Sequence, residues 1–239
     1  MTTALVLSAG GMFAAWEAGV WKVLAAHFQP DIVLGASAGA WTGWAIASGA
    51  TPDELAGEWL DGSLASIRIL RPRPLHEKAR ELVERFRPRI PFGLTVVEAR
   101  SLRPRLVCAP RVTWHHLAAT CSIPLLFPPV LIEGRAHVDG GLMGALPLWA
   151  APEMGARRVI ALNCLHGLPF RVLRAVLPVR PPRSPLEVLT ITPSERLGSL
   201  HDALYWSRAN VERWIELGER DGRRALQGRS AASSVEWWK

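Results

Sequence analysis

The sequence predicts an α/β fold in which helices flank a mainly parallel β-sheet. Short apolar runs of strand length alternate along the chain with longer stretches that have helical spacing. Several of these runs end in glycine-rich turns, as expected where a strand passes into a helix. The chain has 239 residues, of which 49% are hydrophobic and 21% are charged, so its size and composition suit one large domain with a substantial core.

The chain opens with two strand–helix units. The apolar run 4–7 ends in a glycine turn and is followed by helical spacing over 13–28, which Pro30 stops. A second short strand over 31–35 leads into a helix of small residues over 38–48. This alternation is the main support for a parallel sheet.

A complete start signal marks a third helix. Thr51 takes the N-cap position, Pro52 takes the first helical position, and Glu54 completes a capping box. Gly49, just before this signal, is the expected C-cap of the preceding helix. We expect the third helix to run to about residue 64.

Residues 68–111 differ in character from the rest of the chain. They contain eleven arginines and one lysine against four glutamates, and prolines recur along them. We expect a surface segment with one helix over 75–87. Two interpretations stay open: the segment is a cap over the functional site, or it is an ordinary solvated helix with loops.

The second half continues the α/β pattern and completes one domain over residues 1–228. We expect strands over 106–109, 136–139, 158–163 and 186–191, helices over 114–121 (capped by Thr113) and 200–226, and a proline-broken apolar loop over 122–130. Residues 229–239 form a tail, in which Trp237 and Trp238 need an apolar contact or an interface. The sequence does not indicate an oligomeric state.

The formal net charge of the chain is +7, and its pI is near 10.3. Such a charge attracts anionic surfaces, either membrane or nucleic acid, although an arginine-rich composition also follows from genomic base composition. No recognised nucleic-acid module accompanies the charge, so we expect no nucleic-acid partner. A peripheral contact with an anionic membrane stays open.

The cysteines and the start of the chain indicate a cytoplasmic protein with reduced thiols. Cys108, Cys121 and Cys164 are widely spaced and form no CxxC pair, which argues against a disulfide framework or a zinc site. The first residues lack the basic region of a secretory signal. The uncharged run 32–52 is long enough to span a membrane, but its glycines fit a strand–turn–helix better.

A G-x-S-x-G pentapeptide at residues 35–39 lies between a predicted strand and a predicted helix. Such a sharp turn presents its central residue, here Ser37, at the carboxyl edge of a sheet, and the flanking glycines avoid side-chain clashes. The helix that follows directs its N-terminus toward the site and favours developing negative charge. The motif therefore predicts a serine hydrolase with Ser37 as the nucleophile.

Two further glycine turns supply the remaining catalytic groups. An α/β-hydrolase has several strands before its nucleophile and a histidine after its acid, whereas only one strand precedes the strand that carries Ser37. Backbone N–H groups around Gly10, Gly11 and Met12 follow the first strand and can form an oxyanion hole. Asp139 lies at another strand end, and a carboxylate beside a serine can take its proton.

These motifs resemble the patatin-like phospholipase family. Residues 8–19 resemble its glycine-rich oxyanion segment, 35–39 its nucleophile elbow, 118–130 the stretch before its aspartate, and 137–147 its D-G-G segment. The resemblance implies a three-layer α/β/α fold and a Ser–Asp dyad that cleaves lipid esters without a metal or organic cofactor. In this chain the dyad corresponds to Ser37 and Asp139.

Position 13 departs from the family pattern. The family's glycine-rich segment reads G-G-G-x-R/K-G, but this chain has Phe13 at the basic position and Ala14 at the last glycine. In relatives the basic residue can help bind an anionic head group. A neutral ester or a lysolipid-like substrate is therefore an alternative to a phospholipid.

Other functions and other site residues also stay open. An acyltransferase would pass the acyl group to an alcohol or a thiol instead of water, and a lipid-binding protein would keep the fold without activity. His137 falls on the same strand face as Asp139, so a Ser–His–Asp triad is a further hypothesis. Four tryptophans near the first two motifs either line an acyl pocket or pack helices in the core: Trp16, Trp21, Trp41 and Trp44.

Overall fold

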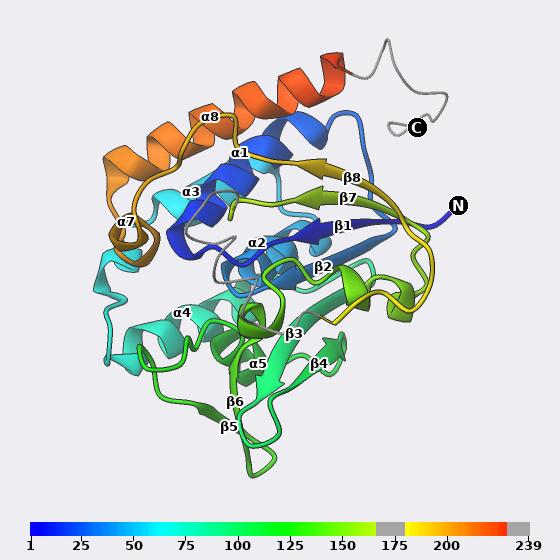
Figure 1. Ribbon diagram of the computed structural model, residues 1–239. Coiled ribbons are helices and arrows are strands. Elements are labelled where there is room, and N and C mark those ends of the chain that lie inside the picture. The colour runs from blue at the N-terminus through cyan, green and yellow to red at the C-terminus, as the bar shows by residue number, and fades with distance from the viewer. Residues whose placement is uncertain (166–179, 229–239) are drawn as a thin grey trace.

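The computed structural model describes residues 1–165 and 180–228, and its centre is an eight-stranded sheet (Figure 1). The strand order is β5-β6-β3-β2-β1-β7-β8, and β4 pairs with β3 beside this path. The strands are β1 (Thr3–Leu7), β2 (Ile32–Ala36), β3 (Phe92–Glu98), β4 (Arg103–Cys108), β5 (Val130–Ile132), β6 (Arg135–Asp139), β7 (Arg158–Leu162) and β8 (Glu187–Ile191).

Five of these strands form a parallel unit. β3, β2, β1, β7 and β8 pair in parallel, whereas β4 and β6 run antiparallel to β3, and β5 runs antiparallel to β6. The prediction of a mainly parallel sheet is confirmed. Because β1 and β2 are neighbours in parallel register, the turns that follow them meet at the same edge of the sheet.

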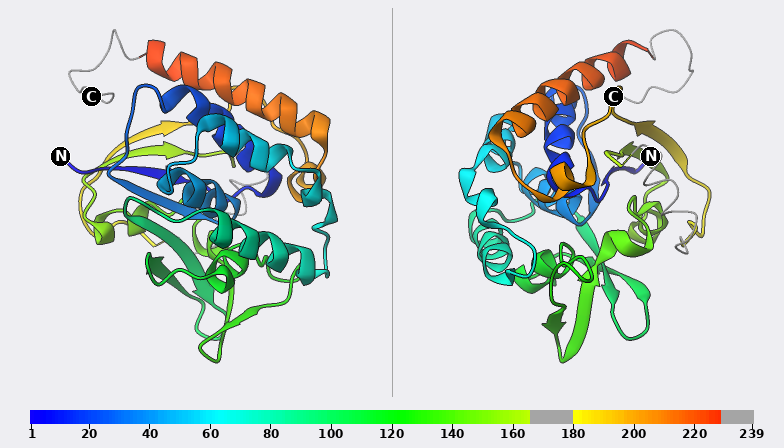
Figure 2. Two further views of the ribbon diagram at one scale, coloured as in Figure 1. Left: turned by 180° about the vertical axis from the view of Figure 1, so that it is seen from behind. Right: turned by 60° about the vertical axis from the view of Figure 1, so that its left-hand side comes forward.

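Helices pack on one face of this sheet. They are α1 (Ala14–Leu24), α2 (Ala38–Ala47), α3 (Pro52–Leu60), α4 (Pro72–Arg85), α5 (Trp114–Ala119), α7 (Leu200–Leu204) and α8 (Arg208–Gln227). α8 lies along α1, and α3 lies beside both, as the turned views of Figure 2 show. The larger hydrophobic core lies between these helices and the sheet.

A second, smaller core covers the opposite face of the sheet. It is built by residues 146–156, which include two 3-10 helices, η4 (Leu148–Ala150) and η5 (Pro152–Met154). Trp149 and Ala150 pack there against side chains of β1, β2 and β7, including Val6 and Leu34. The sheet is thus covered on both faces, which confirms the three-layer fold class.

The capping box that opens α3 forms as expected. Glu54 N donates to Thr51 Oγ1 at 3.2 Å, and Thr51 N donates to Glu54 Oε2 at 2.8 Å. The helix ends at Leu60 and not near residue 64, because Asp61 turns the chain into the short 3-10 helix η2 (Gly62–Ser66). Asp61 Oδ1 accepts from Ser63 N at 2.9 Å and so caps η2.

The surface interpretation of residues 68–111 is wrong for residues 92–98. These residues form β3, which is buried from Phe92 to Val97 and pairs with β2, β4 and β6. The run F-G-L-T-V-V is a continuous apolar stretch, as expected for a strand covered on both faces, but the arginines around it dominate the composition. The helix of this segment, α4, spans residues 72–85, a little earlier than expected.

The predicted helix over 200–226 is divided into α7 and α8. The chain is extended at Tyr205 and Ser207, and Trp206 between them donates its indole N–H to the carbonyl oxygen of Trp59 at 2.9 Å. This contact joins the break to the end of α3. The strand predicted over 186–191 forms as β8 at the edge of the sheet, where only Leu189 and Ile191 of this strand are buried.

Within residues 1–165 and 180–228, no helix combines the length and the apolar composition needed to cross a bilayer. The predicted tail, with Trp237 and Trp238, lies outside the described residues. The domain limits of 1–228 and the cytoplasmic location stay predictions.

Candidate active site

Ser37 lies in the sharp turn between β2 and α2. Its backbone φ of +53° falls in the region that L-residues rarely adopt, which indicates a strained turn of the nucleophile-elbow type. The Ser37 N–H donates to Thr120 Oγ1 at 2.8 Å, and the Thr120 hydroxyl donates onward to the carbonyl oxygen of Thr95 at 2.8 Å. Thr120 therefore ties the strained turn to β3, a role that sequence reasoning missed.

Gly39 explains why this turn needs a glycine after the serine. A Cβ atom at Gly39 would overlap the carbonyl oxygen of Ser8, at the end of β1. The first turn of α2 thus packs directly on the backbone of the neighbouring strand–turn unit. This close approach brings the glycine turn after β1 next to Ser37.

The structure brings Ser37 and Asp139 together. Ser37 Oγ donates to Asp139 Oδ2 at 2.7 Å, and both residues are buried. The other oxygen, Oδ1, accepts from Gly141 N at 2.6 Å, so the glycine turn after β6 holds the carboxylate in place. The two residues are 102 positions apart in the sequence, but β6 and β2 both lie next to β3.

Burial changes the acidity of Asp139. Removal from water raises its pKa to about 7 from an ordinary value of 3.8, although the hydrogen bonds from Ser37 and Gly141 act in the opposite direction. A carboxylate with a pKa near neutrality accepts a proton more readily than an ordinary aspartate does. The pair is therefore suited to proton transfer from serine to aspartate at neutral pH.

The glycine turn after β1 lies beside this pair. Gly11 and Met12 line the same cavity as Ser37, whereas Gly10 lies behind them against Cys164. Gly11 has a φ of +56°, and a Cβ atom there would overlap the carbonyl oxygen of Ala203 in α7. This position therefore requires glycine both for its backbone and for its packing.

A buried carboxyl group supports the glycine turn from behind. Glu17 of α1 accepts hydrogen bonds at Oε1 from Ser8 N at 2.9 Å and from Ser8 Oγ at 3.0 Å, and Cys164 N donates to Ser8 Oγ at 3.0 Å. Burial raises the pKa of Glu17 well above its usual range, which favours the protonated form of this carboxyl group. The signal in the sequence is one glutamate in a helix in which the only other charged residue is Lys22, five positions later.

Apolar side chains enclose the space in front of Ser37. The cavity measures about 450 Å³ including its opening. Its lining comes from the turn after β1, the elbow, α3, α4, the loop before β5, and α7: Gly11, Met12, Ser37, Ala38, Trp59, Ile67, Leu75, Cys121, Ile123, Phe127, Ala203 and Leu204. Leu75 of α4 belongs to the segment 68–111, for which a cap over the site was one of the two open interpretations, whereas the contribution of Trp59 from α3 was not predicted. Within the described chain none of the four tryptophans named above lines this cavity.

Phe13 points into the helix core. Its ring packs edge-on against Trp214 of α8, with ring centroids 5.1 Å apart and planes at 87°. The residue is buried, and it does not line the cavity at Ser37. Position 13 thus joins α1 to α8 instead of supplying a charge to the site.

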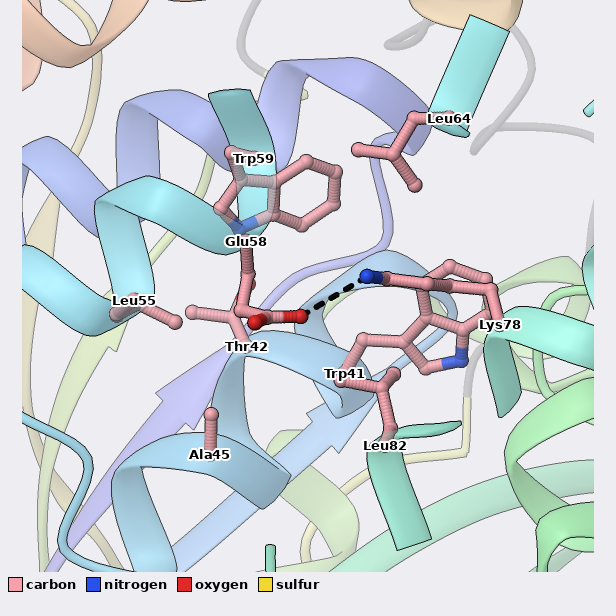
Figure 3. Close-up of a pocket in the computed structure, with 9 residues that line it drawn as sticks. All are labelled: Trp41, Thr42, Ala45, Leu55, Glu58, Trp59, Leu64, Lys78 and Leu82. Atoms are coloured by element: carbon pink, nitrogen blue, oxygen red, sulfur yellow. Dashed lines mark ion pairs between the residues drawn. The ribbon is translucent and has the colours of Figure 1, made fainter. Parts of the chain in front are cut away.

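A second pocket lies behind the first and shares Trp59 with it (Figure 3). Its lining includes Trp41 and Thr42 of α2, and Lys78 of α4 reaches across it to Glu58 of α3 with an Nζ–Oε2 distance of 3.0 Å. The remaining space holds about one water molecule. This buried ion pair fastens α4, and with it Leu75, over the cavity at Ser37.

His137, the histidine considered from the sequence, takes no part in the contact between Ser37 and Asp139. His137 Nδ1 bonds the carbonyl oxygen of Arg135 at 3.0 Å, and Ser37 Oγ donates directly to Asp139 with no histidine between them. All three cysteines are free, and Cys121 lines the cavity. Among residues 1–165 and 180–228, no group of three or more His, Cys, Asp or Glu side chains gathers in a way that could hold a metal ion.

Two solved structures share this fold. VipD from Legionella pneumophila matches with a TM-score of 0.54 and 11% identity, over 95% of this chain and 67% of VipD. The type III effector protein ExoU matches with a TM-score of 0.50 and 14% identity, over 97% of this chain and 54% of ExoU. The chain therefore spans about two thirds of one of these proteins and about half of the other, and the likeness shows the fold alone.

A comparison of sequences gives the family. No curated protein matches the chain. The family model described as patatin-like phospholipase matches residues 5–95 and 68–152, a range that includes the glycine turn after β1, the elbow and the D-G-G turn after β6. Together with the fold, this match shows that the chain belongs to the patatin-like phospholipase family, a family of lipid hydrolases.

Proposed function

We propose that this protein hydrolyses fatty-acyl ester bonds of lipids with a Ser37–Asp139 dyad. The observation that carries the proposal is the 2.7 Å hydrogen bond from Ser37 Oγ to Asp139 Oδ2 at the base of an apolar cavity. The acyl chain occupies the cavity, and the ester carbonyl lies next to Ser37. The reaction proceeds through an acyl-serine intermediate.

In the first step Asp139 takes the proton from Ser37 as Oγ attacks the ester carbonyl carbon. The negative charge that develops on the carbonyl oxygen is stabilised by N–H groups of the turn formed by Gly10, Gly11 and Met12, and by the N-terminus of α2. When the tetrahedral intermediate collapses, the bond to the alcohol breaks and Asp139 returns its proton to the leaving alkoxide. The acyl group stays on Ser37.

In the second step water hydrolyses the acyl-serine. Asp139, again ionised, removes a proton from the water, whose oxygen attacks the acyl carbon. Collapse of this intermediate returns the proton to Ser37 and releases the fatty acid. Glu17 and Thr120 are positioning residues in this scheme, because one holds the glycine turn through Ser8 and the other holds the elbow.

Position 13 supplies no charge that would select an anionic head group near the ester. The position that is basic in the family pattern is here a buried aromatic residue. A neutral ester or a lysolipid therefore suits the site as well as a phospholipid cleaved in the manner of a phospholipase A.

Labelling with a fluorophosphonate probe tests this function directly. We expect wild-type protein to be labelled covalently and Ser37→Ala to lose both labelling and esterase activity. Ser48→Ala is a matched control, since Ser48 is a buried serine at the other end of α2, where its hydroxyl donates to the carbonyl oxygen of Trp44 at 2.7 Å. Full activity of Ser37→Ala contradicts the proposed mechanism, and a folded wild-type protein that is never labelled supports a lipid-binding role instead.

The fate of the acyl group separates a hydrolase from an acyltransferase. We expect free fatty acid as the product even when an alcohol or a thiol is added to the assay. Transfer of most acyl groups to the added acceptor would assign the protein to the acyltransferases.

A further inference from the structure

Two tight turns at the mouth of the cavity present leucines to solvent. In one, Arg71 N donates to the carbonyl oxygen of Arg68 at 3.0 Å, and in the other, Leu126 N donates to the carbonyl oxygen of Ile123 at 3.1 Å. The third residues of these turns are Leu70 and Leu125, which are 72% and 95% exposed. The turns are joined, because Leu70 N donates to the carbonyl oxygen of Leu126 at 2.8 Å.

Neither the backbone nor the core explains leucine at these two positions. Leu70 has a φ of +61° and Leu125 a φ of +70°, a conformation that glycine or asparagine adopts with less strain. An exposed side chain also gains nothing from burial within the chain. Two strained, solvated leucines side by side therefore suggest an apolar partner outside the protein.

A third leucine lies on another border of the same cavity. Leu200 opens α7 and is 64% exposed, and Ala203 and Leu204 of the same helix line the cavity. The two turns also adjoin the lining of this cavity. The lining residue Ile67 directly precedes the turn 68–71, and the lining residue Ile123 is the first residue of the turn 123–126. In Figure 1 α7, the segment before α4 and the loop between α5 and β5 lie along the left-hand side of the molecule.

Positive charge accompanies these leucines. Arg68 and Arg71 flank Leu70, both are exposed, and neither is in an ion pair with a residue of the described part of the chain. Arg196, also exposed, precedes Leu200. Leucines surrounded by arginines suit an anionic bilayer, in which apolar side chains enter the head-group region and guanidinium groups meet lipid phosphates.

An exposed leucine with positive φ is not by itself a sign of a membrane-binding site. Leu102, in the turn between β3 and β4, has a φ of +51° and is 55% exposed, but that turn supplies no residue to the cavity. Single exposed leucines are also ordinary on soluble proteins. What distinguishes Leu70, Leu125 and Leu200 is that all three lie on segments that border one apolar cavity, next to unpaired arginines.

We propose that Leu70, Leu125 and Leu200, with Arg68 and Arg71, form a docking edge that binds an anionic lipid bilayer and turns the mouth of the cavity toward the membrane. This inference rests on the proposed function, because it supposes that the substrate is a lipid held in the bilayer. A lipid would then reach Ser37 from the membrane without crossing water.

Vesicle co-sedimentation of Ser37→Ala protein tests the docking edge independently of catalysis. We expect binding to vesicles of phosphatidylcholine with phosphatidylglycerol, and weaker binding to phosphatidylcholine alone or at high salt. The double variant Leu70→Asn, Leu125→Asn should lower the partition coefficient about tenfold. Because asparagine tolerates positive φ, thermal unfolding of this variant should match that of its parent.

Leu102→Asn is the matched control, since it makes the same substitution in the same backbone conformation away from the cavity. It should leave vesicle binding unchanged, whereas Arg68→Gln with Arg71→Gln should reduce the preference for anionic vesicles. Absence of binding to anionic vesicles, or an equal loss from Leu102→Asn, overturns the docking edge. Protein that docks in this way while wild type never cleaves an ester overturns the proposed function and leaves the docking edge standing.

Discussion

Replacing Asp139 with asparagine should stabilise the protein above neutral pH while abolishing ester hydrolysis. Asp139 is buried, and its pKa is raised to about 7 by loss of contact with water. Above that pH the folded protein holds a negative charge in an apolar surrounding, where charge is costly. Asparagine has nearly the same shape, stays neutral, and keeps an oxygen that can accept from Gly141 N, as Oδ1 now does at 2.6 Å.

The sign and the size of this effect follow from the pKa. Between 3.8 and about 7 the folded state holds a proton on Asp139 that the unfolded state has lost, so the stability contributed by the protonated group falls as pH rises through this range. The difference between these pKa values corresponds to about 4 kcal/mol, at about 1.4 kcal/mol per pH unit. Asp139→Asn should therefore match wild type in stability near pH 4 and exceed it by roughly this amount at pH 8.

Urea unfolding of both proteins at several pH values between 4 and 8.5 measures the difference. The comparison isolates Asp139, because the buried Glu17, whose pKa is also raised, contributes equally to both proteins. Over the same pH range, the rate of ester hydrolysis by wild type should rise as Asp139 becomes ionised, and it should reach half of its maximum near pH 7. A stability difference that stays constant from pH 4 to 8.5 would refute the reasoning, and so would full activity of wild type at pH 5.

Three further substitutions test the residues that hold the elbow and the glycine turn in place. Thr120→Val leaves the buried N–H of Ser37 without its acceptor, so we expect a loss of about 1–3 kcal/mol in urea unfolding and a lower kcat, with both restored by Thr120→Ser. Phe13→Ala removes the edge-on contact with Trp214 and should cost about 3–5 kcal/mol in the same assay. Burial raises the pKa of Glu17 and so favours its neutral form, which Glu17→Gln mimics; we expect the free energy of unfolding at pH 6 to change by less than about 1 kcal/mol, and a much larger loss would mean that Glu17 is ionised.

Much of the fold could be predicted because its signals are local. The strands β1 and β2 are short apolar runs, all three of β1, β2 and β6 lead into glycine-containing turns, and the start of α3 is a complete capping box. Three of the four segments that resemble the family pattern, 8–19, 35–39 and 137–147, supply the turns that meet around Ser37. Their proximity follows from strand order, since β1 and β6 lie on either side of the β2–β3 pair.

The elements that were missed depend on contacts between distant parts of the chain. β3 is a strand because β2, β4 and β6 pair with it, but its apolar run lies among eleven arginines that suggest a surface. The break between α7 and α8 depends on the bond from Trp206 to the end of α3, which helical spacing alone does not reveal. Likewise, Thr120 supports the site by accepting from Ser37 N, and Glu17 supports it by accepting two hydrogen bonds from Ser8, and both contacts join residues that lie apart in the sequence.

The surroundings of the glycine turn bear on which substrates the site can accept. Phe13 contributes only apolar contact there, and burial raises the pKa of Glu17 and so disfavours a charge on that side chain. The negative charge of the transition state must then be met by backbone N–H groups of the turn and by the N-terminus of α2, which carries no acidic residue in its first turn. An arginine introduced at position 13 would have to bury its charge against Trp214, so we expect it to destabilise the fold. Any selectivity for anionic lipids should therefore come from the exposed arginines at the mouth of the cavity and not from the glycine turn.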